Sequence, residues 1–221
     1  MIVKEIFYSI QGEGLHVGCP MIFVRFVGCN LRCSYCDTKY SYSGGKKMNW
    51  RSILQQLHRI REKYHVTDVC ITGGEPLLQR GIEGFLKCLS KEGYETWVET
   101  NGSVSLPFDF RYEKPHTCHF VVDYKLPSSG MEERMLPEMW DRLGPWDVVK
   151  FVTSNVRDFK RAFKLLEKND YLAASYVVIF SPVYGKISLK KLAELIIKYK
   201  VKARLQIQLH KLIWGVNKRG V

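Results

Sequence analysis

Short apolar segments rich in valine and isoleucine recur along this chain at a nearly regular interval, and this recurrence limits its fold more than any other feature. A first strand is expected at Met21 to Val27. Six more are expected at 66–71, 94–99, 120–124, 147–152, 176–180 and 203–208. These six begin about 27 residues apart, which is the length of one strand with one crossover helix. Such near-continuous apolar strands are typical of a buried parallel sheet.

Helical patterns lie between several of these strands, where apolar residues recur at the spacing of one helix face. The residues are Trp50, Ile53, Leu54, Leu57 and Tyr64, then Phe159, Phe163 and Leu166, and then Leu189, Leu192, Ile196 and Tyr199. Two intervals differ: 101–119 has two prolines and no helical pattern, and 126–144 favours only a short helix around Met131. The prediction is an α/β fold, an incomplete (β/α) barrel with some crossover helices shortened or lost, in one domain over residues 1–221.

The composition is that of a globular chain, with 46% hydrophobic and 25% charged residues and no apolar run of membrane-spanning length. The first residues, Met1 to Glu5, lack a signal-peptide pattern, so a reducing cytoplasm is expected. The net charge of +12 would suit nucleic acid, an anionic substrate or an acidic electron donor. Because the positive residues are dispersed over expected helix faces and the C-terminal tail, we expect no direct nucleic-acid binding.

Three cysteines follow the first strand, Cys29, Cys33 and Cys36, in a C-x3-C-x2-C spacing. A structural zinc site takes four protein ligands, and a closed [4Fe–4S] cluster takes four cysteines. A cluster held by only three would leave one iron open to bind and activate another molecule. The alternative is zinc with Cys19 or His16 as the fourth ligand. We expect buried thiols at Cys70, Cys88 and Cys118, and seven is an odd number for a disulfide framework.

Polar segments follow the next three strands at their C-terminal ends, where barrels of this type carry their chemistry. They are 72–76 (Thr-Gly-Gly-Glu-Pro), 99–102 (Glu-Thr-Asn-Gly) and 123–125 (Asp-Tyr-Lys). Two glycines allow a backbone to approach a ligand closely, and Pro76 is suited to the first turn of a helix. We expect these three segments and the cysteine segment to share one rim.

The cysteine spacing and the glycine-rich segment together resemble the radical S-adenosylmethionine (SAM) superfamily. This resemblance implies an iron–sulfur [4Fe–4S] cluster on Cys29, Cys33 and Cys36, with SAM chelating the fourth iron through its amino and carboxylate groups. It also implies that the glycine-rich segment contacts the SAM amino group, and that Tyr35 lies near the adenine.

Further motifs narrow the resemblance. Q-G-E-G at 11–14 precedes the cysteines, Arg25 lies on the first strand, C-D-T stands at 36–38, and L-H-K stands at 209–211. With the segments at 99–102 and 123–125, these resemble the 7-carboxy-7-deazaguanine synthase family of queuosine and deazapurine biosynthesis. The resemblance implies a homodimeric lyase with a reduced (β/α) barrel, and a flavodoxin-like or other electron donor. The implied reaction converts 6-carboxy-5,6,7,8-tetrahydropterin to 7-carboxy-7-deazaguanine with loss of ammonia, after a 5′-deoxyadenosyl radical removes hydrogen from C6 and the ring contracts.

The same resemblance assigns site residues by motif. Those expected at SAM are Tyr35, Cys36, Asp37, Gly74, Glu99, Asn101, Asp123, Tyr124 and Lys125. Those expected at the pterin are Ile10, Gln11, Gly12, Glu13, Arg25, Thr72 and His210. Thr38 is expected to ligate Mg²⁺, which bridges to the substrate carboxylate.

Residue chemistry agrees with several of these roles, although alternatives stay open. Arg25 offers a planar fork for a carboxylate, and its strand neighbours are apolar. The hydroxyl of Thr38 suits Mg²⁺, which takes oxygen ligands, but a threonine can also cap a local turn. The rival enzyme is a radical SAM activase that acts on a partner protein. The rival of another class is a non-catalytic Fe–S or zinc regulator that binds nucleic acid.

Overall fold

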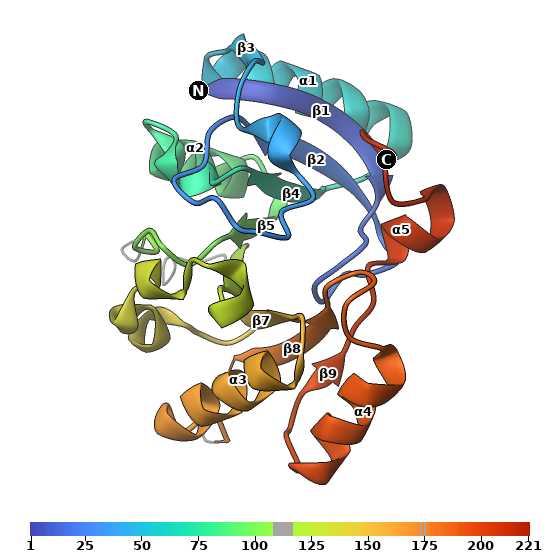
Figure 1. The fold of residues 1–221 in the computed structure, drawn as a ribbon. Coiled ribbons are helices and arrows are strands. Elements are labelled where there is room, and N and C mark those ends of the chain that lie inside the picture. The colour runs from blue at the N-terminus through green and yellow to red at the C-terminus, as the bar shows by residue number, and fades with distance from the viewer. Residues whose placement is uncertain (108–116, 173, 175) are drawn as a thin grey trace.

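One curved sheet organises the part of the chain that the computed structural model describes, residues 1–107, 117–172, 174 and 176–221 (Figure 1). Within these ranges its nine strands run in the order β3-β1-β2-β4-β5-β6-β7-β8-β9. They are β1 Ile2–Ile10, β2 Pro20–Phe26, β3 Lys46–Lys47, β4 Asp68–Gly73, β5 Glu95–Thr100, β6 Cys118–Tyr124, β7 Val148–Thr153, β8 Val177–Pro182 and β9 Arg204–Leu205. From β2 to β9 every neighbouring pair is parallel. Because β3 and β9 are separate edges, the predicted incomplete barrel is confirmed.

The first strand of the chain, β1, was not predicted. It pairs antiparallel with β2, from Val3 opposite Phe26 to Ile10 opposite Pro20. Most of its residues are only partly buried, so it lacks the continuous apolar run that marks the parallel strands. The antiparallel direction has a consequence for the site, because the segment after Ile10 starts at the N-terminal end of β2. That segment reaches functional residues only by turning inward.

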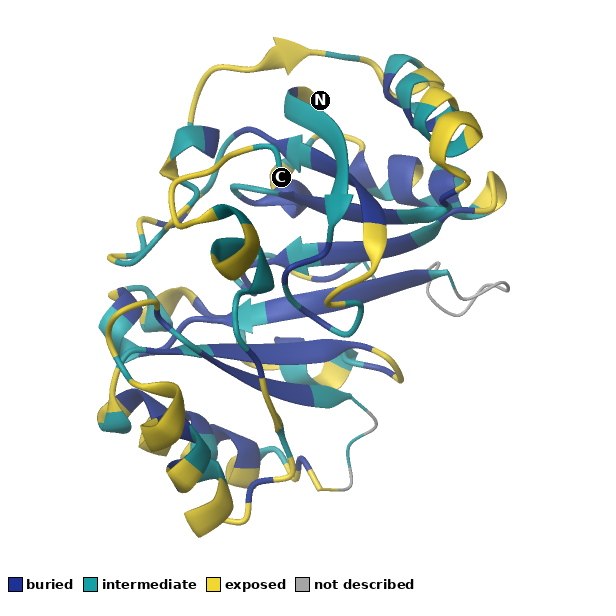
Figure 2. Cartoon of the chain, turned by 90° about the vertical axis from the view of Figure 1, so that its right-hand side faces the viewer, coloured by how far each residue is buried: buried dark blue, intermediate teal, exposed yellow. Residues whose placement is uncertain are grey.

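Four helices cover the convex face of the sheet, and Figure 1 shows them outside the strands: α1 Trp50–Tyr64, α2 Ile82–Lys91, α3 Val156–Lys168 and α4 Leu189–Lys198. The short α5 Leu209–Trp214 lies apart from them, on the side where β1 ends, and packs against Gly12 (Figures 1 and 2). The three predicted helices are confirmed, whereas α2 and α5 were not foreseen. Three residues of the predicted apolar faces, Trp50, Tyr64 and Leu189, lie at helix ends and are exposed. No helix in the described ranges is long and apolar enough to cross a membrane.

The two irregular intervals behave differently. Between β6 and β7 the chain forms three 3₁₀ turns, η3 Pro127–Ser129, η4 Glu132–Arg134 and η5 Pro137–Arg142. The short helix expected around Met131 is therefore a 3₁₀ turn that begins one residue later. Between β5 and β6, residues 101–107 contain no helix, as predicted, and the rest of that prediction (108–116) lies outside the described residues.

Alternation along the strands gives the sheet two apolar layers. The outer layer packs against the helices and includes Ile53 and Leu57 of α1, Phe85 of α2 and Phe159 of α3. The smaller inner layer consists of Met21, Phe23, Cys70, Trp97, Val121, Val148 and Ile179. Toward the C-terminal ends of the strands the inward positions become polar: Arg25, Thr72, Glu99, Asp123 and Lys150. This polar tier positions the candidate site.

Candidate active site

Backbone hydrogen bonds hold the cysteine segment against the glycine-rich segment, two of the four segments predicted to share one rim. The amide of Glu75 donates to the carbonyl of Gly28 at 2.7 Å, and that of Gly74 donates to Phe26 at 3.2 Å. The cysteine segment also reaches the loop after β6, where the amide of Ser34 donates to Ser129 at 3.0 Å. Parallel pairing brings the C-terminal strand ends to one edge, so the expected rim is confirmed.

Gly74 is a close-contact position in this rim. A Cβ at this residue would lie 2.1 Å from the carbonyl oxygen of Gly28 and 2.9 Å from Cβ of Cys29. Gly73 adopts φ +146°, which side-chain-bearing residues rarely do, and its added Cβ would overlap the backbone of Phe26. Both glycines are therefore needed for the loop after β4 to lie directly against the cysteine segment.

The three rim cysteines carry free, partly buried thiols. Asn101 donates from Nδ2 to Sγ of Cys29 at 3.6 Å. Burial raises the pKa of Cys33, and the charge of Lys125 opposes this rise. In the described residues no three His, Cys, Asp or Glu side chains converge on a point that could hold a single metal ion. A cubane cluster places each cysteine on a different iron, whereas zinc needs its ligands around one point.

The other cysteines lie elsewhere. Cys19 and His16 both precede β2. They therefore lie at the end of that strand opposite the rim, away from the three thiols. Cys70 and Cys118 are buried as predicted, whereas Cys88 on the outer helix α2 is only partly buried. The fourth zinc ligand that the sequence suggested is therefore not supplied by Cys19 or His16.

Glu75 ties the glycine loop to the end of β5, a role that the sequence did not indicate. Its buried carboxylate accepts from the amide of Asn101 at 2.7 Å, from the hydroxyl of Thr100 at 2.8 Å and from the amide of Leu77 at 3.0 Å. Burial raises the pKa of Glu75 to about 7, and these donors oppose the shift. The bonds fix Asn101 beside Cys29.

Arg25 lies on β2 with its guanidinium on the inner face. Its Nε donates to Oε1 of Glu5 on β1 at 2.8 Å, and the hydroxyl of Tyr40 donates to the same oxygen at 2.9 Å. Burial lowers the pKa of Arg25, but Tyr40 and Glu5 outweigh this and raise it, so the side chain stays cationic. Glu5 was not foreseen because it belongs to the strand that the sequence did not predict.

Gln11, Thr72 and Glu99 meet on the inner face. Gln11 donates from Nε2 to Oε1 of Glu99 at 3.4 Å, and the hydroxyl of Thr72 donates to the other oxygen at 3.0 Å. Gln11 and Thr72 were expected at the substrate, whereas Glu99 was expected at SAM. The structure therefore places Glu99 at the junction of the two predicted sets.

A chain of alternating charges lies beside this group. Lys150 of β7 contacts Oε2 of Glu13 at 2.6 Å and Oδ2 of Asp123 at 3.6 Å, and Lys125 contacts the same Asp123 oxygen at 2.9 Å. The other Asp123 oxygen, Oδ1, is buried and has no hydrogen-bond partner among the described residues. Sequence reasoning missed Lys150, because a single lysine in an apolar strand carries no motif.

The C-terminal segment closes one side of the site. Gln208 donates from Nε2 to Glu13 at 2.6 Å, and Lys211 of α5 contacts Asp37 at 2.6 Å. His210 packs so tightly on Gly12 that a Cβ there would lie 2.2 Å from Nδ1. Burial alone would raise the pKa of Asp37, but Lys211 holds it well below its usual range. Gln208 and Lys211 were not among the predicted site residues.

Three further predicted residues have specific surroundings. Thr38 precedes the 3₁₀ turn η1 (Lys39–Ser41), and its hydroxyl donates to Asp37 at 2.9 Å rather than capping that turn. Tyr35 reaches the carbonyl of Val152 at 3.4 Å, and burial raises its pKa. Tyr124 packs in the outer layer, with its ring 5.6 Å from that of Trp140, so only its backbone faces the rim.

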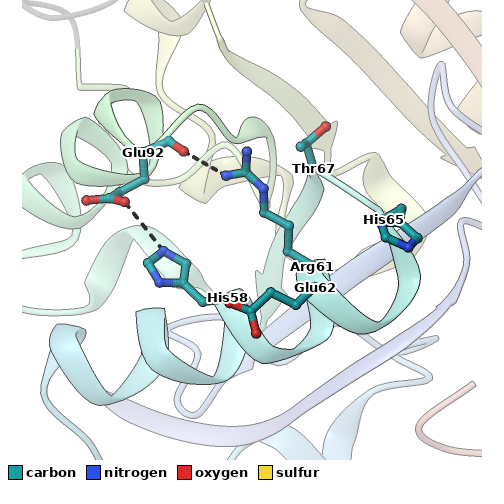
Figure 3. Close-up of a pocket in the computed structure, with 6 residues that line it drawn as sticks. All are labelled: His58, Arg61, Glu62, His65, Thr67 and Glu92. Carbon is teal, nitrogen blue, oxygen red and sulfur yellow. Dashed lines mark hydrogen bonds and ion pairs between the residues drawn. The ribbon is translucent and has the colours of Figure 1, made fainter.

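Two pockets lie away from this rim. One of about 640 Å³ lies between the C-terminal ends of α1 and α2, where His58 contacts Glu92 at 3.4 Å and Arg61 donates to the carbonyl of Glu92 at 2.9 Å (Figure 3). The other, of about 780 Å³, lies at the N-terminal ends of the strands and includes Trp97 and His119. Barrel chemistry belongs to the opposite strand ends, so we place the candidate site at the cysteine rim.

Comparison with known families agrees with this placement. A family model described as the Radical SAM superfamily matches residues 23–114, which include all three rim cysteines and the glycine loop. The fold and the rim define a radical SAM protein, and membership of that superfamily implies a [4Fe–4S] cluster and SAM.

Full-length relatives specify the branch of the superfamily. The 7-carboxy-7-deazaguanine synthase of Clostridium acetobutylicum is 41% identical and covers 99% of this chain and 98% of its own. That of Koribacter versatilis is 34% identical over 100% of both chains. The crystal structure of QueE from Escherichia coli matches with a TM-score of 0.72 at 26% identity, over 95% of this chain and 94% of that one. The chain belongs to the 7-carboxy-7-deazaguanine synthase family.

Proposed function

We propose that this protein is a lyase that converts 6-carboxy-5,6,7,8-tetrahydropterin to 7-carboxy-7-deazaguanine with loss of ammonia. The observation that carries the proposal is the joining of the Q-G-E-G segment to the cysteine rim by α5, because it brings the family-specific and superfamily-specific motifs into one site. The activase and the non-catalytic regulator gain no support from the full-length relatives, which are named as synthases.

The rim residues fit the two cofactors. Cys29, Cys33 and Cys36 would hold the cluster, and Gly74 keeps the neighbouring loop close enough to line its open side. Asn101, Asp123 and Lys125 supply polar groups for SAM, and the unpartnered Oδ1 of Asp123 is a ready acceptor. When bound and reduced, the cluster supplies the electron that cleaves SAM to the radical that takes hydrogen from the substrate.

The inner polar tier would hold the pterin. Gln11, Glu13 and Glu99 offer a row of amide and carboxylate groups to the donors and acceptors of a pterin ring. The guanidinium of Arg25 would bind the substrate carboxylate; its Nε is paired with Glu5, and the terminal end of the fork is the part offered to a ligand. Ile10, Gly12, Thr72 and His210 complete this set. The protein contributes placement and exclusion of water while the ring contracts.

Magnesium would complete the substrate site. The hydroxyl of Thr38 and the Asp37 carboxylate that it contacts are the hard oxygen donors that Mg²⁺ prefers. Thr38 would hold the ion, whose charge would offset that of the substrate carboxylate. Thr38→Ala should lower turnover and blunt its response to added Mg²⁺, whereas Thr38→Ser should retain more of both. A Thr38→Ala protein with the parental Mg²⁺ response would place the metal elsewhere.

The electron donor, the oligomeric state and the compartment follow from the same proposal. We infer an acidic, flavodoxin-like electron donor, since the chain carries a net charge of +12. We also infer a homodimer, as expected from the family resemblance, and a reducing cytoplasm, which suits the free thiols of Cys29, Cys33 and Cys36.

The proposal is tested by separating SAM cleavage from substrate turnover. Reconstituted protein with SAM, Mg²⁺ and the carboxypterin under anaerobic conditions should yield the deazaguanine by mass spectrometry. Arg25→Ala should keep SAM cleavage without substrate and lose product formation at least a hundredfold, because it removes the guanidinium that would bind the substrate carboxylate. Arg59→Ala, at an exposed position of α1, is the matched control. Equal loss of both activities in Arg25→Ala would contradict this placement.

A further inference from the structure

Lys150 occupies an unusual place for a lysine, in the interior of a buried parallel strand. Its neighbours in β7, Val148 and Val149 before it and Phe151 after it, are buried apolar residues. The side chain of Lys150 is 8% exposed and its ammonium faces the inner polar tier. A lysine is seldom buried without a charged partner, so its surroundings must explain it.

The surroundings are two carboxylates from distant parts of the chain. Glu13, in the loop after β1, lies 2.6 Å from the ammonium. Asp123 lies 3.6 Å from it, because Asp123 of β6 and Lys150 of β7 are opposite each other in the parallel ladder. Burial would lower the pKa of Lys150, but Glu13 and Asp123 raise it well above its usual value. Burial would raise the pKa of Glu13, but Lys150 and Gln208 lower it. Both partners therefore stay charged.

The two carboxylates belong to the two halves of the site. Glu13 is part of the segment assigned to the pterin, and Asp123 is part of the segment assigned to SAM. We propose that Lys150 is a positioning residue whose ammonium holds Glu13 against Asp123, so that binding of SAM and binding of the carboxypterin favour one another. This inference rests on the proposed function, because it needs both ligands to occupy this site.

The physical basis is that both ligands order the same group, the Lys150 ammonium. A ligand bound to the free oxygen of Asp123 fixes that carboxylate, which fixes the Lys150 ammonium and with it Glu13. The second ligand then meets a Glu13 that is already in place, which is positive coupling between the sites. Without Lys150, Asp123 keeps Lys125 at 2.9 Å, whereas Glu13 loses the cation that links it to Asp123. Each ligand must then order its own carboxylate.

The test measures SAM affinity by equilibrium dialysis on anaerobically reconstituted protein, with and without saturating carboxypterin. In the parent protein the pterin should tighten SAM binding by about five- to 150-fold, the usual range for coupled sites. Lys150→Met, which keeps the length and removes the charge, should reduce this ratio to less than twofold. Lys150→Arg should retain most of it, and Lys164→Met, at an exposed position of α3, should leave it unchanged.

A second readout separates positioning from a merely structural role. In Lys150→Met the pKa of Glu13 should rise, since Gln208 is uncharged and Asp37 raises it further, so pterin affinity should fall with acid at a higher pH than in the parent. Lys150→Arg should keep the parental pH profile. If Lys150→Met does not fold, Glu13→Gln must lose the coupling ratio instead.

The outcomes distinguish this inference from the function beneath it. A parent protein that neither binds nor turns over the carboxypterin would refute the proposed function, and the Lys150 role with it. Turnover by the parent, with a Lys150→Met ratio equal to the parental one, would refute only the Lys150 role. Weaker binding of both ligands with an unchanged ratio would show that Lys150 is purely structural.

Discussion

The two ends of the inner sheet face use charged groups in opposite ways. At the C-terminal ends of the strands, Lys150 bridges carboxylates, and Asp123 keeps a buried oxygen without a partner in the described residues. At the N-terminal ends, the ring of Trp97 stacks on that of His119 at 4.5 Å between centroids and meets the tilted ring of His16 at 4.3 Å. Each of these histidines faces its own carboxylate, Asp68 at 3.7 Å and Glu95 at 2.6 Å.

The difference separates a functional end from a structural one. The inner polar tier brings side chains from β1, β2, β4, β5, β6 and β7 close together. We therefore expect its charged groups to respond to bound ligands. At the N-terminal ends of the strands, which form the floor of the barrel, each ring instead packs against a neighbouring ring and lines the pocket of about 780 Å³. We therefore expect the N-terminal ends of the strands to contribute to stability and the inner polar tier to contribute to binding.

Loss of a rim cysteine should have the largest effect. Cys29→Ala, Cys33→Ala or Cys36→Ala should abolish the visible absorbance of the reconstituted cluster and all SAM cleavage, because each supplies one iron ligand. Cys88→Ala on the outer helix α2 is the matched control and should keep both. Stoichiometric zinc without iron in anaerobically prepared protein would contradict the cluster.

Gly74→Ala should be the next most damaging change. Its Cβ would lie 2.1 Å from the carbonyl oxygen of Gly28, so the glycine loop and the cysteine segment must separate. We expect a loss of about 3 kcal/mol in the free energy of unfolding, with lower iron content after reconstitution.

A glycine in open space provides the control for Gly74. Nothing lies within 4 Å of a Cβ at Gly84 of α2, so Gly84→Ala should raise helix stability by up to about 1 kcal/mol and leave the iron content unchanged. Equal thermal midpoints for the Gly74 and Gly84 variants would show that the close approach at the rim is not needed.

A substitution at the N-terminal ends of the strands should lower stability and leave catalysis unchanged. Trp97→Leu removes the ring between the two histidines, and we expect it to cost about 2 kcal/mol in the free energy of unfolding. The KM for the carboxypterin, measured well below the unfolding temperature, should equal that of the parent. Trp50→Leu at an exposed helix end should change neither quantity. A raised KM in Trp97→Leu would end the division between the two tiers.

The smallest effect expected is the dependence of stability on pH through Glu13. Because Lys150 and Gln208 outweigh burial and lower its pKa, Glu13 stabilises the fold at pH values above its unfolded pKa. That contribution should be lost as the pH falls through the lower, folded value. Denaturant unfolding of cluster-free protein should show Glu13→Gln less stable than the parent near neutral pH, by on the order of 1 kcal/mol, with the gap closing in acid.

An exposed acid gives the reference for that measurement. Glu133→Gln should follow the parent at every pH, since Glu133 is exposed in the turn η4. A Glu13→Gln curve that runs parallel to the parent curve in acid would mean that Glu13 is not ionised by its pairing with Lys150.

Several features were readable from the sequence because they depend on neighbours in the chain. The parallel strands were located to within a few residues by apolar runs, and β4 was displaced by two because its polar end, Thr72 and Gly73, continues the ladder. The C-x3-C-x2-C spacing and the glycine loop were recognisable for the same reason. Rules for parallel strands then predicted that these motifs share one edge.

The tertiary structure alone decided which distant residues complete the site. The strand β1 has no continuous apolar run, yet its antiparallel pairing supplies Glu5 to Arg25 and sends Glu13 into the barrel. Lys150 and Gln208 carry no local motif, and the L-H-K motif did not show that Lys211 contacts Asp37. Their roles come from strand register and from the path of the C-terminal segment, which only packing fixes. Local periodicity and spacing therefore determined the class of this protein, whereas long-range pairing determined how its charges meet.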